Sequence, residues 1–585
     1  MVAGGGAIAL QSFSEAEEEE GLLPQPTTAS SAIRVRPITA GPLVFLLPLL
    51  GFGVVVLALS GLFVSPTTLF SAAEGKKAVV AQEREPGVQQ RVVEWSPEDQ
   101  ALRSYRWEAP AVHESLQRHL DQLTAAENRT RSWLLETRTT STSGVGIGLG
   151  STDPPEAIRP GAAMAVSGAF PEKGEGPGEF EGGARSKYYE LVQEWQTGRP
   201  VDSCEKGSWE SEYTTLHAEM MNGTLPPSLI EYTCAKEKCG GLADRLLGTA
   251  STFLYAILTR RAFSISWTQP VPFDLIFDSP HIDWSQAYPN TTTPPNPIYS
   301  DTQTLGDRLD VDAMNWSSKK VDDFFEKGVS AFKQAWVRLS LNRGTVLRSF
   351  SYPSIRPQLD QLGLTATTAY SCLLPYLIRP KKSALEFINQ YTSFFALPSV
   401  FVVGVQIRTG DFSLRLDTFD SNQTVSRYSS FFTCAEAVSR TYAHPSQKII
   451  YYLLSDSHAL KEEALRMFPE RVVVSGLSQS HPEIEKAESG WGWEGVKGAA
   501  DGMMGSVVEM WTFAATDFQI LTARSGFGKI PTWIRGRPGT TIQIFNPYLE
   551  VAYTKSLKTL PPEVDCTSDE TLKSFTEMAQ GWSLG

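Results

Sequence analysis

Residues 400–411 constrain the fold of this chain more than any other stretch. Five of the eight residues from Val400 to Ile407 are Val or Ile. Such a run is typical of a strand buried on both faces of a parallel sheet. It breaks directly into Arg-Thr-Gly-Asp, and ligands of open α/β sheets lie just beyond the carboxyl ends of the strands. Arg408 is therefore either placed to hold a phosphate or carboxylate, or a structural residue paired with Asp411.

The length and charge of the chain narrow the class of protein. Its 585 residues are too many for one ordinary domain, so we expect at least two. The net charge is -13 and no basic stripe is present, which argues against nucleic acid as a partner.

One segment is expected to cross a membrane. Residues 41–64 form 24 consecutive residues without a charged side chain, which is enough for a membrane-spanning helix. All six cysteines and all five Asn-x-Ser/Thr sequons follow this segment. Disulfides and N-glycans form in the secretory pathway, so we expect a single-pass type II protein with its main part in the lumen. Six cysteines allow fifteen pairings, among which the sequence does not choose.

Composition divides the chain into five parts. We expect a cytoplasmic tail over 1–40, the span over 41–64, and a stem over 65–185 that is largely disordered because it has little apolar surface to bury. Two α/β halves follow over 186–395 and 396–585. Within the stem, a partly helical stretch is expected over 101–137.

Two further segments carry polar groups at the ends of predicted elements. Gly240 and Gly241 lead directly into an amphipathic helix that carries Asp244 and Arg245, and a helix N-terminus can bind phosphate. A plain turn explains the two glycines equally well. A second helix carries Glu509 and is followed by Asp517, a short strand over 518–521, and a turn that can offer a hydroxyl and backbone N–H groups to a phosphate. That turn consists of Ser525, Gly526, Phe527 and Gly528.

Together with the strand at 400–407, these segments resemble plant xyloglucan fucosyltransferases. The similar blocks occur in the family's order and cover roughly residues 234–535. They are Gly241-Leu242 with Arg245-Leu246, Val403 to Arg408, and Val508-Glu509-Met510 with Ser525 to Gly528.

The resemblance implies a fold, an activity and a set of site residues. It implies a Golgi membrane enzyme with two Rossmann-like halves facing a cleft (GT-B-like). Such an enzyme transfers fucose from GDP-fucose with inversion and needs no metal or other cofactor. Arg408 would hold the diphosphate, Asp517 and Ser525 to Gly528 would lie at the GDP in the second half, and Gly240 to Arg245 would line the cleft from the first half. The family usually has Asn at the position of Asp244 and Thr at the position of Gly526, which bears on donor choice.

The chemistry also needs a group that accepts the proton of the acceptor hydroxyl. Asp411, Glu509 and Asp517 are the carboxylates in the matching blocks, although the last two equally well brace a helix. Asp310 and Asp312 have the spacing of a metal-binding pair, but a solvated surface pair is the simpler interpretation.

The sequence is compatible with three functions. The first is fucosyl transfer to a hydroxyl of a cell-wall or glycoprotein carbohydrate. The second is protein O-fucosylation or transfer from another GDP-sugar, and the third is a membrane-anchored glycan-binding protein without catalysis.

Overall fold

The computed structural model describes residues 104–141, 204, 209–234, 239–267, 269, 271–285, 302–305, 308–327, 332–480, 493–549 and 564–580. By its internal contacts the chain divides into two units, residues 1–92 and 93–585, and all described residues belong to the second unit. No helix among the described residues is both long and apolar enough to cross a membrane. The span expected over 41–64 lies outside the described residues, as does the tail before it.

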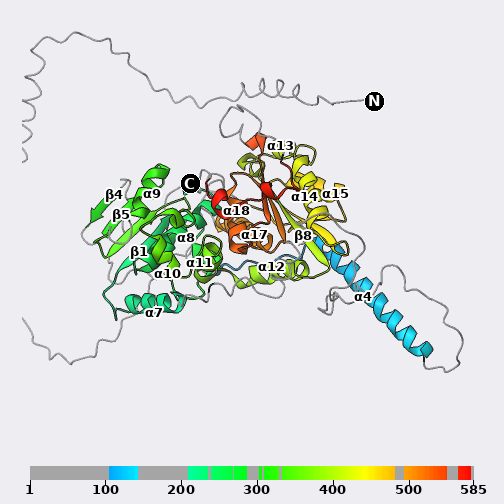
Figure 1. Ribbon diagram of the computed structural model, residues 1–585, viewed down its shortest axis with the longest axis horizontal. Helices are drawn as coiled ribbons and strands as arrows, with labels where there is room; N and C mark the ends of the chain where they lie inside the picture. The colour runs from blue at the N-terminus through cyan, green and yellow to red at the C-terminus, as the bar shows by residue number, and fades with distance from the viewer. Residues whose placement is uncertain are drawn as a thin grey trace, which may run out of the picture. The chain divides into compact units, whose positions relative to one another are not determined.

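The first sheet is built from residues 229–340 and has the strand order β2-β1-β6-β5-β4 (Figure 1). Its pairs are parallel except for the antiparallel pair of β4 and β5. The most buried helix, α8, packs against β1 because nearly all of its residues are apolar or small. The strands are β1 (Leu229–Cys234), β2 (Ala262–Trp267), β4 (Thr302–Leu305), β5 (Arg308–Asp312) and β6 (Trp336–Ser340). The helices are α7 (Trp209–Met221), α8 (Leu242–Leu258), α9 (Ser318–Glu326), α10 (Arg356–Gln361) and α11 (Ala369–Leu377).

The second sheet is entirely parallel, with the order β10-β9-β8-β11-β12. The predicted strand at 400–407 is its central strand, and all eight of its residues are buried. The strands are β8 (Val400–Ile407), β9 (Lys448–Ser455), β10 (Val472–Val473), β11 (Phe518–Thr522) and β12 (Thr541–Ile544). The helices are α13 (Asp417–Asp420), α14 (Ser429–Tyr442), α15 (His458–Met467), α17 (Trp493–Ala514) and α18 (Gly526–Arg535).

Helices join the two sheets into one packed unit. Helix α12 (Lys382–Phe395) packs against α17 and β8, and α18 packs against α8 and α11. Tyr370 of α11 stacks on Trp533 of α18 with ring centroids 4.9 Å apart. Two two-residue strands, β3 (Phe277–Asp278) and β7 (Arg379–Pro380), form a separate antiparallel pair. An α/β fold was expected from the sequence, and the structure confirms it, with one mainly parallel and one entirely parallel sheet.

Part of the expected stem is packed against this unit. The helix predicted near residues 101–137 is α4 (Glu114–Ser141), and the segment before it buries Tyr105 and Trp107. Trp107 meets Phe387 of α12 edge to face, and His119 stacks on Phe394. The composition of the stem did not indicate this packing, because a few aromatic side chains in a polar stretch suffice for it.

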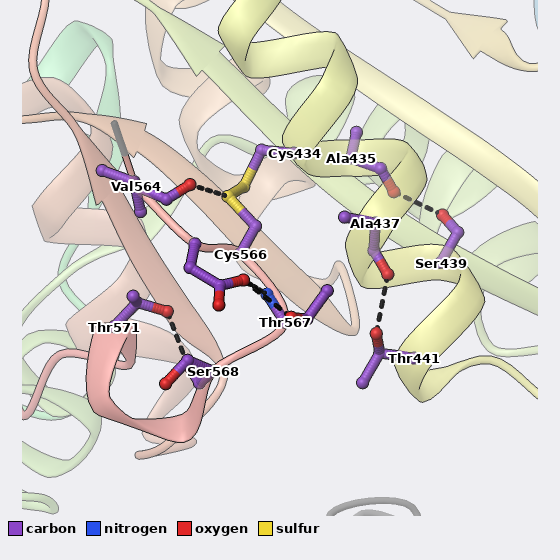
Figure 2. The surroundings of a disulfide bond; sticks show 11 residues. Cys434, Ala435, Ala437, Ser439, Thr441, Val564, Cys566, Thr567, Ser568 and Thr571 are labelled. Atoms are coloured by element: carbon purple, nitrogen blue, oxygen red, sulfur yellow. Dashed lines mark hydrogen bonds between the residues drawn. A yellow bond between two sulfur atoms is a disulfide. The ribbon is translucent and has the colours of Figure 1, made fainter. Parts of the chain in front are cut away.

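All six cysteines are paired. The disulfides join Cys204 to Cys372, Cys234 to Cys239, and Cys434 to Cys566. Figure 2 shows the last of these, which ties residues 564–580 near the C-terminus to α14. This segment includes the short helix α20 (Phe575–Met578).

Candidate functional site

The strand order of the second sheet changes direction at β8, which identifies a candidate ligand site at the carboxyl ends of β8 and β11. The chain enters at β8, runs outward through β9 and β10, and then returns to the other side of β8 as β11 and β12. The connections after β8 and β11 therefore leave in opposite directions along the sheet. In open α/β sheets, ligands bind beyond the carboxyl ends of the two strands at such a switch point.

Arg408 is the first residue after β8 and lies at this switch point. Its guanidinium contacts two carboxylates, Asp456 at 2.9 Å and Asp411 at closer range. About a fifth of the Arg408 side chain is exposed, compared with 39% for Asp411 and 2% for Asp456. One partner of the guanidinium is thus fixed in the interior and the other faces solvent.

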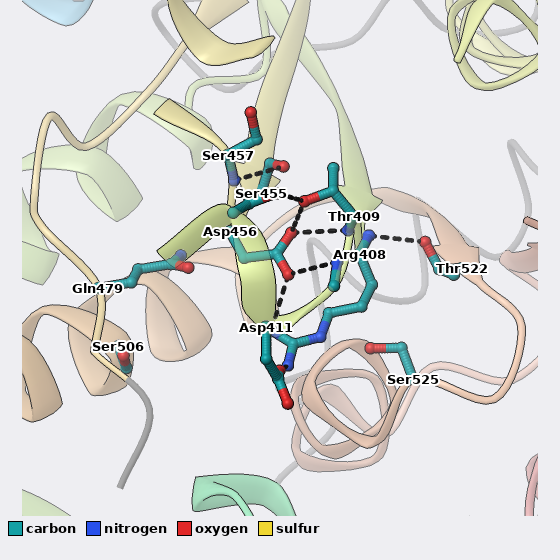
Figure 3. A network of polar contacts seen from close by, with 12 residues as sticks. Arg408, Thr409, Asp411, Ser455, Asp456, Ser457, Gln479, Ser506, Thr522 and Ser525 are labelled. Carbon is teal, nitrogen blue, oxygen red and sulfur yellow. Dashed lines mark hydrogen bonds and ion pairs between the residues drawn. The ribbon is translucent and has the colours of Figure 1, made fainter. Parts of the chain in front are cut away.

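Asp456 follows β9 and organises the turn after β8 (Figure 3). One of its oxygens accepts from the Thr409 backbone N–H at 2.7 Å and from the Thr409 hydroxyl at 2.8 Å, and the other accepts from the Gly410 N–H at 3.0 Å. Gly410 has a φ of 122°, a conformation that residues with a side chain rarely adopt. The turn that carries Arg408 is therefore held rigidly.

The start of α18 lies over the end of β8. The Gln406 side chain donates to the Ser525 hydroxyl at 3.2 Å and accepts from the Thr522 N–H at 3.1 Å. A Cβ atom at Gly528 would lie 2.6 Å from the Gln406 carboxamide oxygen, so only glycine allows this close approach. The predicted turn from Ser525 to Gly528 thus brings the N-terminus of a ten-residue helix to the same sheet edge as Arg408.

The residues that follow β12 add further contacts at this edge. The Asn546 side chain donates to the Arg408 carbonyl at 2.7 Å and accepts from the Tyr548 N–H at 3.0 Å. The Arg427 guanidinium lies 3.8 Å from the centre of the Tyr548 ring. Asp456 and Asn546 were not among the residues predicted from the sequence. Asp456 could have been found, because it directly follows the apolar run at 448–454 that was recognised as strand-like, whereas Asn546 follows a strand too short to predict.

Gly240, Gly241, Asp244 and Arg245 lie at the start of α8, in the other half. The Asp244 carboxylate accepts from the Gly241 N–H at 3.2 Å and so caps the helix. Arg245 is buried over Trp267 and donates to the carbonyls of Gly240 at 2.9 Å and Gln269 at 2.5 Å. These contacts fix the turn itself, so the capping role of Asp244 accounts for the carboxylate without a nucleotide.

Two predicted site residues lie elsewhere in the second half. Glu509 is fully buried in α17, where it accepts from the Lys461 ammonium at 2.8 Å and from the side chains of Ser475 and Gln479. Asp517 precedes β11 and accepts from the Val402 N–H at 2.8 Å, level with the early part of β8. Asp517 therefore lies at the edge opposite to Arg408, because Leu521 at the far end of β11 pairs with Gln406. The structure thus gives both carboxylates structural partners, and a catalytic role for Glu509 and a nucleotide contact for Asp517 stay predictions.

No group of three or more His, Cys, Asp or Glu residues in the described part of the chain is arranged to hold a metal. Asp310, considered above as half of a metal-binding pair, is buried and forms an ion pair with Arg308 at 2.9 Å. The interpretation as a solvated surface pair is therefore wrong for Asp310, which belongs to a buried cluster of charged side chains in the first sheet.

Comparisons with known proteins gave matches among solved structures alone. A scan against protein-family models and a search of curated proteins found no match. A mutant of Arabidopsis thaliana FUT1 in complex with GDP is 16% identical to this chain, with a TM-score of 0.41. The match covers 58% of this chain and 79% of the FUT1 chain. The fucosyltransferase NodZ from Bradyrhizobium is 14% identical, covers 52% of this chain and 91% of its own, and has a TM-score of 0.32. A structure titled as NodZ alpha-1,6-fucosyltransferase soaked with GDP-fucose, also 14% identical, covers 53% and 92%, with a TM-score of 0.31.

Proposed function

We propose that this chain is a fucosyltransferase that moves fucose from GDP-fucose to a hydroxyl of a carbohydrate acceptor, with inversion at the anomeric carbon. The observation that carries the proposal is the meeting of Arg408 and the N-terminus of α18 at the switch point between β8 and β11. A guanidinium and a helix N-terminus are both suited to a diphosphate. The choice of fucose and guanine rests on the resemblance of three ordered sequence blocks to xyloglucan fucosyltransferases.

The chemistry requires positive charge whose interaction grows as the bond between fucose and the diphosphate breaks. Arg408 supplies a full charge, and α18 supplies backbone N–H groups and the positive end of its dipole. Asp456 holds the guanidinium in place through a buried contact, so the cation needs little reorganisation when the donor binds. The donor diphosphate competes with Asp411 for the outer side of the guanidinium.

Of the three carboxylates considered as the base, Asp411 is the one that lies at this edge of the sheet. It is partly exposed and in contact with Arg408. In the proposed reaction it accepts the proton of the acceptor hydroxyl once the diphosphate has taken its place on Arg408. The first half, through the start of α8, contributes to the acceptor side.

We further propose that the catalytic part lies in the Golgi lumen, anchored by residues 41–64. The pairing of all six cysteines supports an oxidising compartment. Protease added to intact microsomes should spare residues 65–585, and glycosidase should shift the band. Digestion down to the span would reverse the proposed orientation.

Donor turnover tests the activity. The purified full-length chain should release GDP from GDP-fucose, should transfer fucose to at least one member of a carbohydrate acceptor array, and should do so in the presence of a chelator. Preference for another GDP-sugar would replace the donor, and transfer to folded protein domains would point to protein O-fucosylation. Glycan binding without turnover of any nucleotide sugar would refute the enzyme and leave a binding protein.

A further inference from the structure

Lys529 is a buried cation that the proposed mechanism does not use. It lies in the first turns of α18, four residues after Ser525, and only 2% of its surface is exposed. Its ammonium group has no hydrogen bond or ion pair with any described residue. Buried lysines are rare unless paired, because removing a charge from water is costly.

The helix geometry directs this side chain toward the start of α18. Residues four apart share one face of a helix, so Lys529 lies on the face of Trp533, which stacks on Tyr370 of α11. Helical side chains lean toward the N-terminus, and the ammonium therefore points back toward Ser525, whose hydroxyl contacts Gln406 at the end of β8. Arg524, two residues before α18, acts electrostatically on Lys529.

The surroundings of Lys529 leave its charge uncompensated. Burial, and to a smaller extent the charge of Arg524, lowers the pKa of Lys529 from 10.5 to about 8. No carboxylate acts on its pKa, in contrast to Lys461, a second lysine that is buried among the described residues and is paired with Glu509. An anion bound at the start of α18 would supply the missing partner.

We propose that Lys529 binds a phosphate group of the nucleoside diphosphate, as a second cation beside Arg408. This inference rests on the proposed function, since it names a further residue of the same site. The ammonium and the first N–H groups of α18 then act on one phosphate, while Arg408 acts from the end of β8. Lys529 also makes donor affinity depend on pH in a range where arginine does not titrate.

The helices that pack against α18 carry further charged or titratable groups. Asp244, Arg245 and Tyr255 lie on α8, Tyr370 and Tyr376 on α11, and Glu494, Lys497, Asp501 and Glu509 on α17. Burial and Arg524, and none of these groups, shift the pKa of Lys529. We therefore expect the part of the pH dependence of GDP affinity that disappears in Lys529→Met to come from Lys529 itself.

The test compares ligands and variants by calorimetry on the full chain. Lys529→Met removes the charge at similar length, Lys529→Arg keeps a charge that does not titrate, and Lys382→Met on the exposed face of α12 is the matched control. Loss of a charged hydrogen bond should weaken GDP and inorganic pyrophosphate binding roughly 10- to 100-fold in Lys529→Met, with no change for guanosine. The Met variant should melt no lower than the wild type without nucleotide, since it removes a buried unpaired charge. Between pH 7 and 9, the decline of GDP affinity should be smaller in Lys529→Arg than in the wild type.

The outcomes separate this inference from the proposed function. If Lys529→Met binds GDP and pyrophosphate as tightly as the wild type does, the inference is overturned and the proposed function stands. Pyrophosphate binding that depends on Lys529, without any GDP binding, would keep the anion site and refute the function. A Met variant that melts lower and loses guanosine and GDP affinity equally would make Lys529 structural and overturn the inference.

Discussion

Arg408 is held by two carboxylates that differ in how easily they can be displaced. Asp456 is buried and already accepts three hydrogen bonds from Thr409 and Gly410, so it belongs to the framework of the turn. Asp411 is partly exposed and follows Arg408 by three residues. The alternatives of a ligand-binding and a paired Arg408 are therefore compatible, because an anion can replace Asp411 while Asp456 stays.

This difference predicts the effect of neutralising Asp411. Asp411→Asn removes a negative charge beside the proposed diphosphate and should strengthen GDP binding by about 0.2–1 kcal/mol, the range for exposed pairs. If Asp411 is the base, fucosyl transfer should fall in the same variant. Calorimetry and turnover would be compared with Asp417→Asn, an exposed carboxylate in α13. Weaker GDP binding in Asp411→Asn would contradict the displacement.

Lys529 predicts a pH dependence of stability in the nucleotide-free protein. Its pKa is about 8 in the folded chain and 10.5 ordinarily, so between these values the unfolded chain binds the proton and the folded chain does not. Stability should therefore rise with pH in this window, by at most about 1.4 kcal/mol per pH unit, and be lowest below pH 8 where both states carry the charge. Denaturant unfolding of wild type and Lys529→Met from pH 7.5 to 10 measures the difference. Identical pH slopes in the two proteins would contradict this burial of an unpaired charge.

At the level of elements, the sequence predicts best where one run of residues determines the structure. The apolar run at 400–407 could only be a buried strand, and its break at Arg408 indicated the functional edge. The partners of Glu509 and Asp517, Lys461 and the Val402 N–H, could not be predicted because they come from distant segments. Asp517 lies away from Arg408 because β11 runs parallel to β8, so that a residue before β11 and a residue after β8 are at opposite edges.

The ion pair of Glu509 and Lys461 gives an element-scale prediction. Glu509→Gln leaves a buried ammonium without its counter-ion and should lower the free energy of unfolding by about 3–5 kcal/mol. Because none of the hydrogen bonds that Glu509 forms with described residues involves Arg408 or the start of α18, GDP affinity of the folded fraction should stay within about twofold. The double variant Lys461→Met/Glu509→Leu should recover most of the lost stability. A selective loss of GDP affinity or turnover in Glu509→Gln would restore Glu509 as a catalytic candidate.

At the scale of the whole molecule, the sequence predicted two α/β halves, and the structure contains a mainly parallel sheet over 229–340 and an entirely parallel one over 400–544. The contacts between them were not predictable. Tyr370 meets Trp533 across 163 positions of sequence, and residues near 105–119 pack against α12 from outside either half. Such contacts depend on the shapes of surfaces that form only after each half has folded.

The disulfide between Cys434 and Cys566 closes a loop with a sequence separation of 132 and fastens the C-terminal segment to the nucleotide half (Figure 2). Replacing both cysteines by Ser should lower the free energy of unfolding by about 2–5 kcal/mol, because the unfolded chain gains conformational entropy without the cross-link. Thermal unfolding of this variant is compared with that of the Cys234→Ser/Cys239→Ser variant, whose loop is much shorter and whose entropic effect should be smaller. A smaller loss for the long loop than for the short one would contradict this explanation.

The central claim is that the carboxyl edge of the second sheet binds GDP through Arg408. The most direct measurement is calorimetric titration of GDP into the wild-type chain, Arg408→Lys and Arg408→Ala at fixed salt, with melting curves to verify folding. Wild type should bind, Arg408→Ala should lose about 1.5–3 kcal/mol of binding free energy, and Arg408→Lys should fall between them because it keeps the charge and loses the planar fork. Equal GDP affinity in folded wild type and Arg408→Ala, or no binding by folded wild type, would contradict the claim.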